Sequence, residues 1–222
     1  MIELVAALAA AASECQRATP IQAAAPDTVI VYDLDGVTAF GRQVVETRSG
    51  VSTHREFIYG QRRNGDWMVG RDRGTYRTVF GAIPVSDTHA GPSGFQRNRD
   101  MKRDPVLALA GLAVGESVVL PGAETFVAPG KRPIRNDQPV KATFIGCFTE
   151  EVAGAPERIL KYEIDLPGVG RRGKEDDIGP TRTIATVSIS PSLGYLVSYN
   201  SQHGSFRARW VGYEIPTAPP GR

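Results

Sequence analysis

The chain has few of the residues that build covalent or metal-centred sites. Its 222 residues include two cysteines, Cys15 and Cys147, and three histidines, His54, His89 and His203. Two thiols cannot form a disulfide framework or a four-cysteine zinc site, and the histidines lie far apart in the sequence with no local ligand partner. We therefore expect no metal, no cofactor and no catalytic residue. We expect the core to be held by apolar packing, with Cys147 as a small buried side chain of an apolar strand.

Strong charge of either sign is also lacking. The 26 basic and 24 acidic residues leave a formal charge of +2, which is too small for the field that nucleic-acid binding usually needs. The basic run over residues 97–103 contains an aspartate and no aromatic residue, which is typical of a solvated loop. We expect no nucleic-acid partner.

Long hydrophobic runs are absent, and the apolar run over residues 4–12 is too short to span a bilayer. With the polar stretch after it and the Ala23-Ala24-Ala25 triplet, this run resembles the hydrophobic region and cleavage site of an export signal. We predict a leader over residues 1–25, a periplasmic or secreted product, one β-rich domain over residues 26–215, and a loose tail over 216–222.

Two features oppose this leader. Residues 1–14 contain no Lys or Arg, which an upstream start codon would explain, and Pro26 directly follows the Ala25 bond. One alternative is a short buried helix. Another is a lipoprotein anchor on Cys15, but Ser13 and Glu14 stand where small apolar residues are wanted, which disfavours it.

Glycine and proline, at 24 and 16 residues, are in excess and indicate many short elements joined by turns. Apolar and polar residues alternate between these turns, as in half-buried strands. We predict hairpins around Asp35-Gly36, Asn64-Gly65, residues 153–156 and residues 191–193, with strands over 28–34, 37–48, 52–61, 66–71, 140–152, 157–166, 181–190, 194–201 and 206–215. Residues 75–80 are expected to continue the second hairpin as a meander.

Three stretches break this pattern. Residues 84–104 have no apolar period and several turn formers, which predicts a long surface loop or flap. Residues 121–139 and 167–180 are expected to be loops as well. Asp104-Pro105 is a helix start, and it predicts one short helix over residues 106–112, followed by a brief strand over 118–120. The predicted fold class is mainly β, all-β or α+β: a large curved antiparallel sheet or half-barrel with one or two short helices.

The strand over residues 29–34 ends in Asp33-Leu34-Asp35-Gly36. This string resembles the first motif of the haloacid dehalogenase phosphotransferases. The resemblance implies Asp33 as the phosphorylated nucleophile, Asp35 as the acid/base, and magnesium held by both. That family has a doubly wound sheet, whereas strands follow Asp35 here, so a hairpin turn is the preferred interpretation.

Three further blocks occur in order along the chain: Leu112–Ser117, Thr143–Gly146 with Ala153-Gly154 and Tyr162–Ile164, and Ala185–Val197. Their order resembles certain uncharacterised bacterial envelope proteins that are similar to the periplasmic lipoprotein-carrier superfamily. The resemblance implies an antiparallel half-barrel wrapped over a helix, and the handling of a lipid or acyl chain. Ser188 stands where that family often has an aromatic residue, and a single helix is predicted where the carriers use more.

We therefore expect an exported, non-enzymatic envelope protein that binds a lipid-like or acyl ligand, or a lipidated protein, in a concave sheet. Candidate lining residues are Trp67, Tyr76, Phe144, Tyr162 and Trp210, each also interpretable as ordinary core. Contact with a membrane would be peripheral at most. The alternatives are a structural or interaction module of the envelope without a small ligand, and the Asp33/Asp35 phosphatase. The sequence leaves the oligomeric state open.

Overall fold

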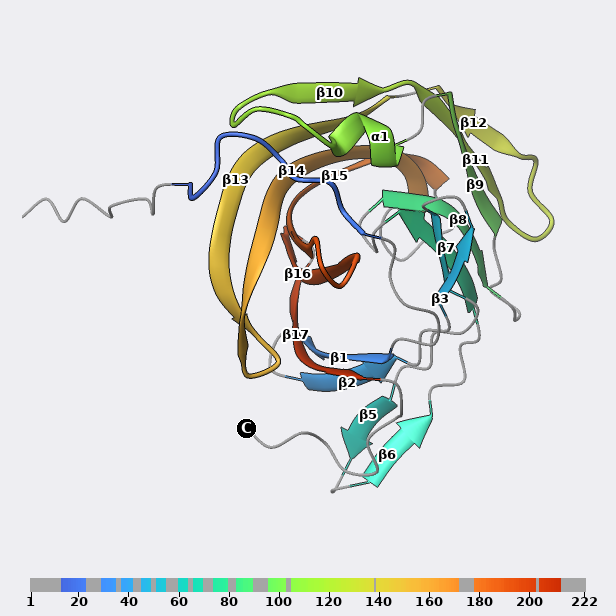
Figure 1. Ribbon diagram of the computed structural model, residues 1–222. Helices are drawn as coiled ribbons and strands as arrows, with labels where there is room; N and C mark the ends of the chain where they lie inside the picture. The colour runs from blue at the N-terminus through green and yellow to red at the C-terminus, as the bar shows by residue number, and fades with distance from the viewer. Residues whose placement is uncertain are drawn as a thin grey trace, which may run out of the picture.

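The computed structural model is mainly β and contains two antiparallel sheets that do not close into a barrel (Figure 1). This confirms the predicted fold class. The structure describes residues 13–22, 29–34, 37–41, 45–48, 51–54, 60–63, 66–69, 74–79, 83–89, 96–102, 105–137, 139–171, 178–202 and 204–212.

The larger sheet, here called the long sheet, has ten strands in the order β10-β13-β14-β15-β16-β17-β1-β2-β5-β6. Its bounds are β1 (Val29–Leu34), β2 (Val37–Gly41), β5 (Gly60–Arg63), β6 (Asp66–Val69), β10 (Ser117–Leu120), β13 (Val140–Val152), β14 (Ala155–Arg171), β15 (Ile178–Ser190), β16 (Tyr195–Ser201) and β17 (Gly204–Gly212).

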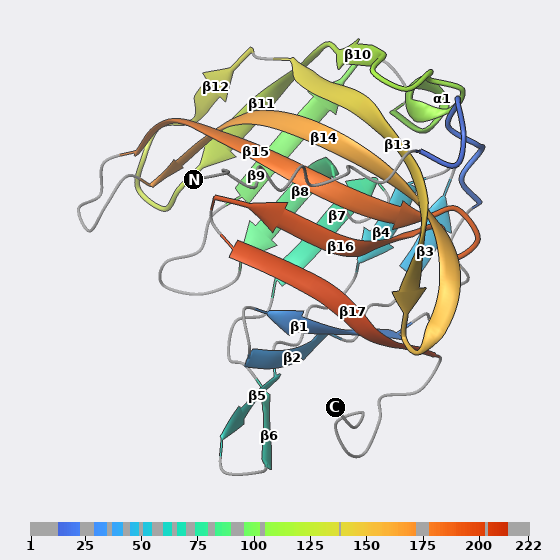
Figure 2. The ribbon, with the colours of Figure 1, turned by 90° about the vertical axis from the view of Figure 1, so that its left-hand side faces the viewer.

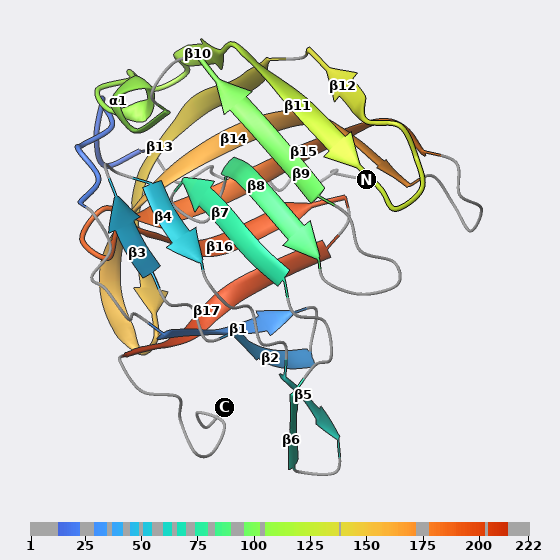
Figure 3. The same ribbon diagram turned by 90° about the vertical axis from the view of Figure 1, so that its right-hand side faces the viewer.

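The smaller sheet, here called the short sheet, has seven strands in the order β12-β11-β9-β8-β7-β4-β3. Figures 2 and 3 show from opposite sides that it faces the long sheet. Its bounds are β3 (Val45–Arg48), β4 (Val51–His54), β7 (Gly74–Val79), β8 (Ile83–His89), β9 (Gln96–Met101), β11 (Gly122–Val127) and β12 (Ile134–Asn136).

The predicted hairpins are confirmed as local pairs. β1 pairs with β2, β5 with β6, β13 with β14, and β15 with β16, all antiparallel. At the β13–β14 turn, Ala153 and Gly154 have φ angles of 52° and 85°. Two consecutive positive φ values are typical of the type I′ turn, whose twist matches that of the flanking strands.

The predicted connection between hairpins is wrong in the first third of the chain. The strand expected over residues 37–48 splits into β2 of the long sheet and β3 of the short sheet, and residues 52–61 split between β4 and β5 in the same way. The strand over residues 74–79 is not a meander after β6, because β7 pairs with β4 and β8. The alternation of apolar and polar residues and the turn residues between strands indicate which neighbouring strands pair. They do not indicate where the chain passes from one sheet to the other.

The predicted loops are also partly wrong. Residues 84–104 contain most of β8 and all of β9, residues 121–139 contain β11 and β12, and β14 runs on to Arg171. The sequences of β8 and β9 place polar residues at successive positions, so no apolar period marks them. Arg99 of β9 is buried with a charged partner, which a hydrophobicity pattern cannot reveal.

The core lies on the inner face of β13, β14 and β15. In β14 the side chains of Leu160, Tyr162 and Ile164 have no exposed surface, whereas Glu163 between them is exposed. The hydroxyl of Tyr162 donates to the backbone oxygen of Leu109 at 3.4 Å. Leu109 ends α1 (Pro105–Leu109), the predicted helix in a shortened form, and its buried side chain there covers part of the inner face.

The outer face of the same strands is exposed to solvent. Arg182 donates two hydrogen bonds to the carboxylate of Asp165, at 2.8 and 2.6 Å, across the β14–β15 pair. The hydrogen bond from the Arg182 guanidinium lowers the pKa of the Asp165 carboxyl, with its positive charge adding to the effect. The β14–β15 pair therefore has one buried face and one solvent-exposed face, as the alternation predicted.

A ten-residue segment before β1 also belongs to the fold. Residues 13–22, here called the strap, lie beside α1, and both sit at the same end of the two sheets in Figures 2 and 3. Ala18 of the strap is buried in the core, with Cys15 and Ile21 packed against it. The predicted leader includes this strap, while its expected boundary at Ala25 lies outside the described residues.

A buried polar bridge joins the two sheets at β14. Arg99 of β9 donates to Glu124 of β11 at 2.6 Å and to the backbone oxygen of Pro167 in β14 at 2.8 Å. The side chains of Arg99 and Glu124 are 3% and 2% exposed. Asn136 of β12 donates to the backbone oxygen of Gly168 at 3.2 Å. These contacts fix the short sheet against the second half of β14.

The bridge predicts a coupled effect on stability. Glu124→Ala removes the buried carboxylate to which Arg99 donates at 2.6 Å and should lower the free energy of unfolding by about 3 kcal/mol. The double variant Arg99→Met with Glu124→Leu should lose less than Glu124→Ala alone, as measured by urea unfolding. The exposed Arg135–Asp137 pair is the control, and Asp137→Ala should cost under about 1 kcal/mol. Equal losses for the buried and exposed pairs would contradict the assignment.

Candidate functional site

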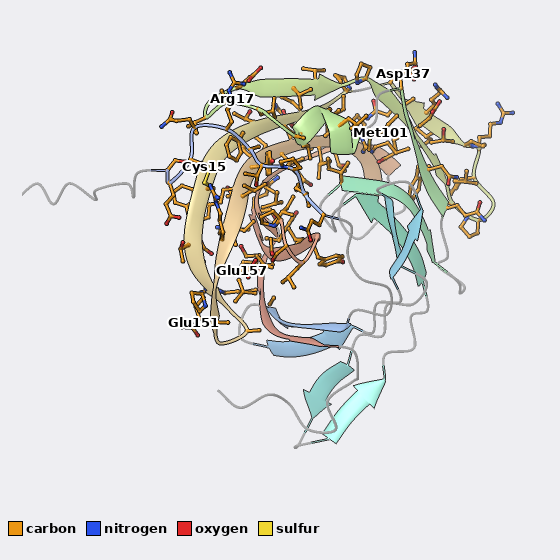
Figure 4. The ribbon with its side chains drawn as sticks, viewed as in Figure 1. Cys15, Arg17, Met101, Asp137, Glu151 and Glu157 are labelled. Carbon is orange, nitrogen blue, oxygen red and sulfur yellow. A yellow bond between two sulfur atoms is a disulfide. The ribbon has the colours of Figure 1, made fainter. Side chains whose placement is uncertain are left out.

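A pocket of about 550 Å³ lies where the edge strands of the two sheets meet. Figure 4 labels Asp137 at this junction, beside the ends of β10 and β12. The lining residues come from β9, β10, β11, β12 and the segments flanking them; they are Asp100, Lys102, Val119, Pro121, Gly122, Ala123, Arg135, Asp137 and Pro139. We call it the edge pocket.

The edge pocket has apolar walls and charged groups of both signs. Val119 is 49% exposed although it lies in the middle of β10. The Arg135 guanidinium donates to the Asp137 carboxylate at 2.9 Å, and both side chains remain largely exposed. Among the lining residues that the structure describes there is no serine, cysteine or histidine. This composition suits contact with a polar surface that itself carries charges of both signs.

Two of the predicted lining residues lie together in the core. Phe144 of β13 is the ladder partner of Tyr162 of β14, and their ring centroids are 5.2 Å apart. Neither side chain has exposed surface. Burial raises the pKa of the Tyr162 hydroxyl well above its ordinary value, so that phenol stays protonated and does not serve as a base near neutral pH. In the described structure both rings are packed within the buried core of the protein.

The other three predicted residues lie on strands that are not neighbours. Trp67 is in β6 at the far edge of the long sheet, Trp210 is in β17 of that sheet, and Tyr76 is in β7 of the short sheet. Their side chains lie outside the described part of the structure. Among the candidates whose side chains the structure describes, Phe144 and Tyr162 lie together, and the other three are placed by strand alone.

The phosphatase alternative loses its structural context. Asp33 lies in β1, which is antiparallel to both β17 and β2, and Asp35 lies outside the described residues. The dehalogenase motif requires a parallel, doubly wound sheet that presents its aspartates at the carboxyl ends of strands. The described strands form two antiparallel sheets instead, so this fold gives the phosphatase alternative no support.

The expectation for the cysteines is wrong. Cys15 of the strap and Cys147 of β13 form a disulfide with Cα atoms 5.6 Å apart (Figure 4). Cys147 is fully buried, as predicted, but it is bonded rather than free. Two cysteines cannot make a framework of several bridges, yet they can make one bridge, and a separation of 132 residues in the sequence hides it.

The disulfide is part of a dense polar contact. The hydroxyl of Ser13 accepts hydrogen bonds from the backbone NH of Cys147 at 3.1 Å and of Cys15 at 3.3 Å. The Glu14 carboxylate accepts from the backbone NH and the hydroxyl of Thr149, at 2.9 and 3.0 Å. Arg158 donates to the sulfur of Cys147 at 3.3 Å. Groups from β13 and β14 thus hold the start of the strap.

Backbone hydrogen bonds hold the rest of the strap. The NH groups of Glu14, Ala18 and Gln22 donate to the backbone oxygens of Cys147, Leu112 and Pro191, at 2.9, 2.8 and 2.9 Å. In return Gly111 donates to Ala18 at 3.0 Å and Val114 donates to Gln16 at 3.0 Å. The strap therefore ties β13, the segment after α1, and the β15–β16 turn together.

The described residues contain no group of three or more histidine, cysteine, aspartate or glutamate side chains that could hold a metal ion. His54 lies in β4 and His89 in β8, and His203 lies outside the described part. Within the same part of the chain, no helix has the length and apolar character needed to cross a membrane.

Comparison with protein-family models, with curated proteins and with solved structures gave no match to this chain.

The disulfide makes a prediction on stability. Cys15→Ser should lower the free energy of unfolding by about 3 kcal/mol, because the open chain gains the entropy of a long loop. A saturating thiol reductant should lower the stability of the unsubstituted protein by a similar amount and leave that of Cys15→Ser unchanged. Chemical denaturation with and without reductant measures both effects. A protein equally stable in both conditions would show that the bridge contributes nothing.

The close approach of the strap makes a second prediction. Gly146 has a φ of 150°, and a Cβ placed there would lie 2.5 Å from the Ser13 hydroxyl and 2.7 Å from its Cβ. Gly146→Ala should lower the free energy of unfolding by about 2 kcal/mol. In a Ser13→Gly background the same change should cost about 1 kcal/mol less, because the clash is removed while backbone strain remains. Urea unfolding of the four proteins measures the cycle.

Gly154→Ala is the matched control for this cycle. Gly154 also has a positive φ, of 85°, but its Cβ would meet nothing within 4 Å. Its cost, about 1 kcal/mol of backbone strain, should be the same in the unsubstituted chain and in the Ser13→Gly background. Additive losses at Gly146 and Ser13 would mean that the strap does not pack as described.

Proposed function

We propose that the chain is an exported, non-enzymatic interaction module of the cell envelope. The observation that carries this proposal is the Cys15–Cys147 disulfide, because structural disulfides form and persist in oxidising compartments such as the periplasm or the exterior. A sulfur in that bond is not available to carry a lipid anchor. The protein is therefore proposed to act in the periplasm or outside the cell without a thioether-linked lipid on Cys15.

The interaction surface in this proposal is the edge pocket. Its lining offers two carboxylates, two cations and an exposed valine on an edge strand. In the antiparallel pair of β10 with β13, alternate residues of β10 turn their backbone groups away from β13. Such an edge supports binding of a partner that brings its own backbone or charged groups. The pocket supports a binding role, since its exposed valine is flanked by charged groups of both signs.

Acyl-ligand binding is the second candidate. What favours it is the arrangement of α1 against the inner face of a curved antiparallel sheet (Figure 1), which is the form implied by the resemblance to the lipoprotein carriers. Against it, Phe144 and Tyr162 are fully packed by protein atoms at the α1 end. A ligand would have to lie between the sheets away from that end. The candidates Trp67, Tyr76 and Trp210 belong to this second function.

Two measurements test the proposed function. Maleimide labelling of the protein in intact cells should find no free thiol in the exported protein unless a reductant is added, because both cysteines are bonded. A stable pool with two reactive thiols in a folded protein would contradict export to an oxidising compartment. Native mass spectrometry of gently purified protein should give the mass of the bare chain. A co-purifying acyl chain would instead favour the second candidate.

A further inference from the structure

We propose that the export signal ends at Ala12 and that the mature chain begins at Ser13, so that the whole strap is retained. This inference rests on the proposed export, and it concerns where the chain is processed. It replaces the boundary at Ala25 that the sequence pattern suggested.

The first argument is what a cut at Ala25 would remove. It would delete the strap, and with it Ala18, which is 4% exposed, and Cys15, which is bonded to the core. The backbone oxygens of Cys147, Leu112 and Pro191 would lose the NH groups that now donate to them. Leaving buried polar groups without partners is costly, as is the loss of a native disulfide.

The second argument is that the receiving surface is shaped for the strap. Gly146 interrupts β13 at the point where the ladder with β14 shifts register, between Phe144 and Gly146. Because Gly146 has no Cβ, Ser13 can approach the strand and bond the NH of Cys147. Arg17 adds a bond from its guanidinium to the backbone oxygen of Gly111 at 3.0 Å. A segment destined for removal would need none of these features.

The third argument is the sequence around each bond. Ala10-Ala11-Ala12 supplies the small residues of a cleavage site directly after the apolar run, and Ser13 follows it. Ala23-Ala24-Ala25 supplies small residues as well, but Pro26 follows that bond. The first triplet ends one residue before Ser13, whose hydroxyl accepts from the NH of Cys147, and the second begins one residue after Gln22, whose NH donates to Pro191. Cleavage at the first triplet leaves the described fold intact.

The test is the first residue of the exported protein. The full-length chain is expressed from its own gene with a C-terminal affinity tag, purified from the periplasmic fraction, and examined by N-terminal sequencing and non-reducing peptide mapping. We expect a sequence that begins Ser-Glu-Cys, and a peptide pair joined through Cys15 and Cys147. A first residue at Pro26, or at any position after Cys15, would overturn the proposal while leaving export intact. A cytosolic chain that retains Met1 would overturn export as well.

Matched substitutions locate the bond independently. Signal cleavage requires a small residue before the cut, so Ala12→Leu should abolish processing and accumulate the unprocessed chain. Ala25→Leu should leave processing unchanged. Both positions lie outside the described residues, and both changes replace alanine by leucine. The reverse pattern, with processing blocked only by Ala25→Leu, would place the cut after the strap and refute the inference.

Discussion

The structure depends on covering one apolar face. β13, β14 and β15 are long strands whose inner side chains, such as Phe144, Tyr162 and Ile164, have no exposed surface. A single sheet cannot bury its own face. Three separate parts of the chain do so here: α1 through Leu109, the strap through Ala18, and the short sheet, which is joined to β14 by Arg99. Each of these covers a different stretch of the same ladder.

These covers differ in their chemistry. α1 contributes apolar packing and one weak hydrogen bond to Tyr162. The short sheet is joined through a buried ion pair, which aligns two groups of strands with more directional precision than apolar contact alone. The strap combines apolar burial, backbone hydrogen bonds and a covalent bond. Of these three segments the strap is held by the most kinds of interaction, and it is the one that the sequence pattern assigned to a leader.

Sequence reasoning succeeded where a short-range pattern carries the structure. The alternation of Leu160, Tyr162 and Ile164 predicts β14 and its buried face, and Ala153-Gly154 predicts the turn before it. It failed where the structure is made by distant partners. Arg99 reads as a solvated charge until Glu124 of another strand is placed beside it.

For the candidate site, the same distinction holds. The edge pocket draws on β9, β10, β11 and β12, none of which shows a motif of its own. The Cys15–Cys147 bond joins residues 132 positions apart. An apolar run followed by small residues is a local pattern, and by that pattern residues 13–22 belong to the predicted leader. Their contacts with β13 show instead that they belong to the fold.

The position of the two cysteines also bears on how the protein acquires its covalent form. A chain exported from its N-terminus would present Cys15 long before Cys147 emerges, so the first thiol must wait for most of the domain. With only two cysteines in the sequence, only one intramolecular pairing exists. Such a chain needs an oxidant to complete its fold but no disulfide isomerase to correct it, and its one wrong outcome is a bond to another molecule.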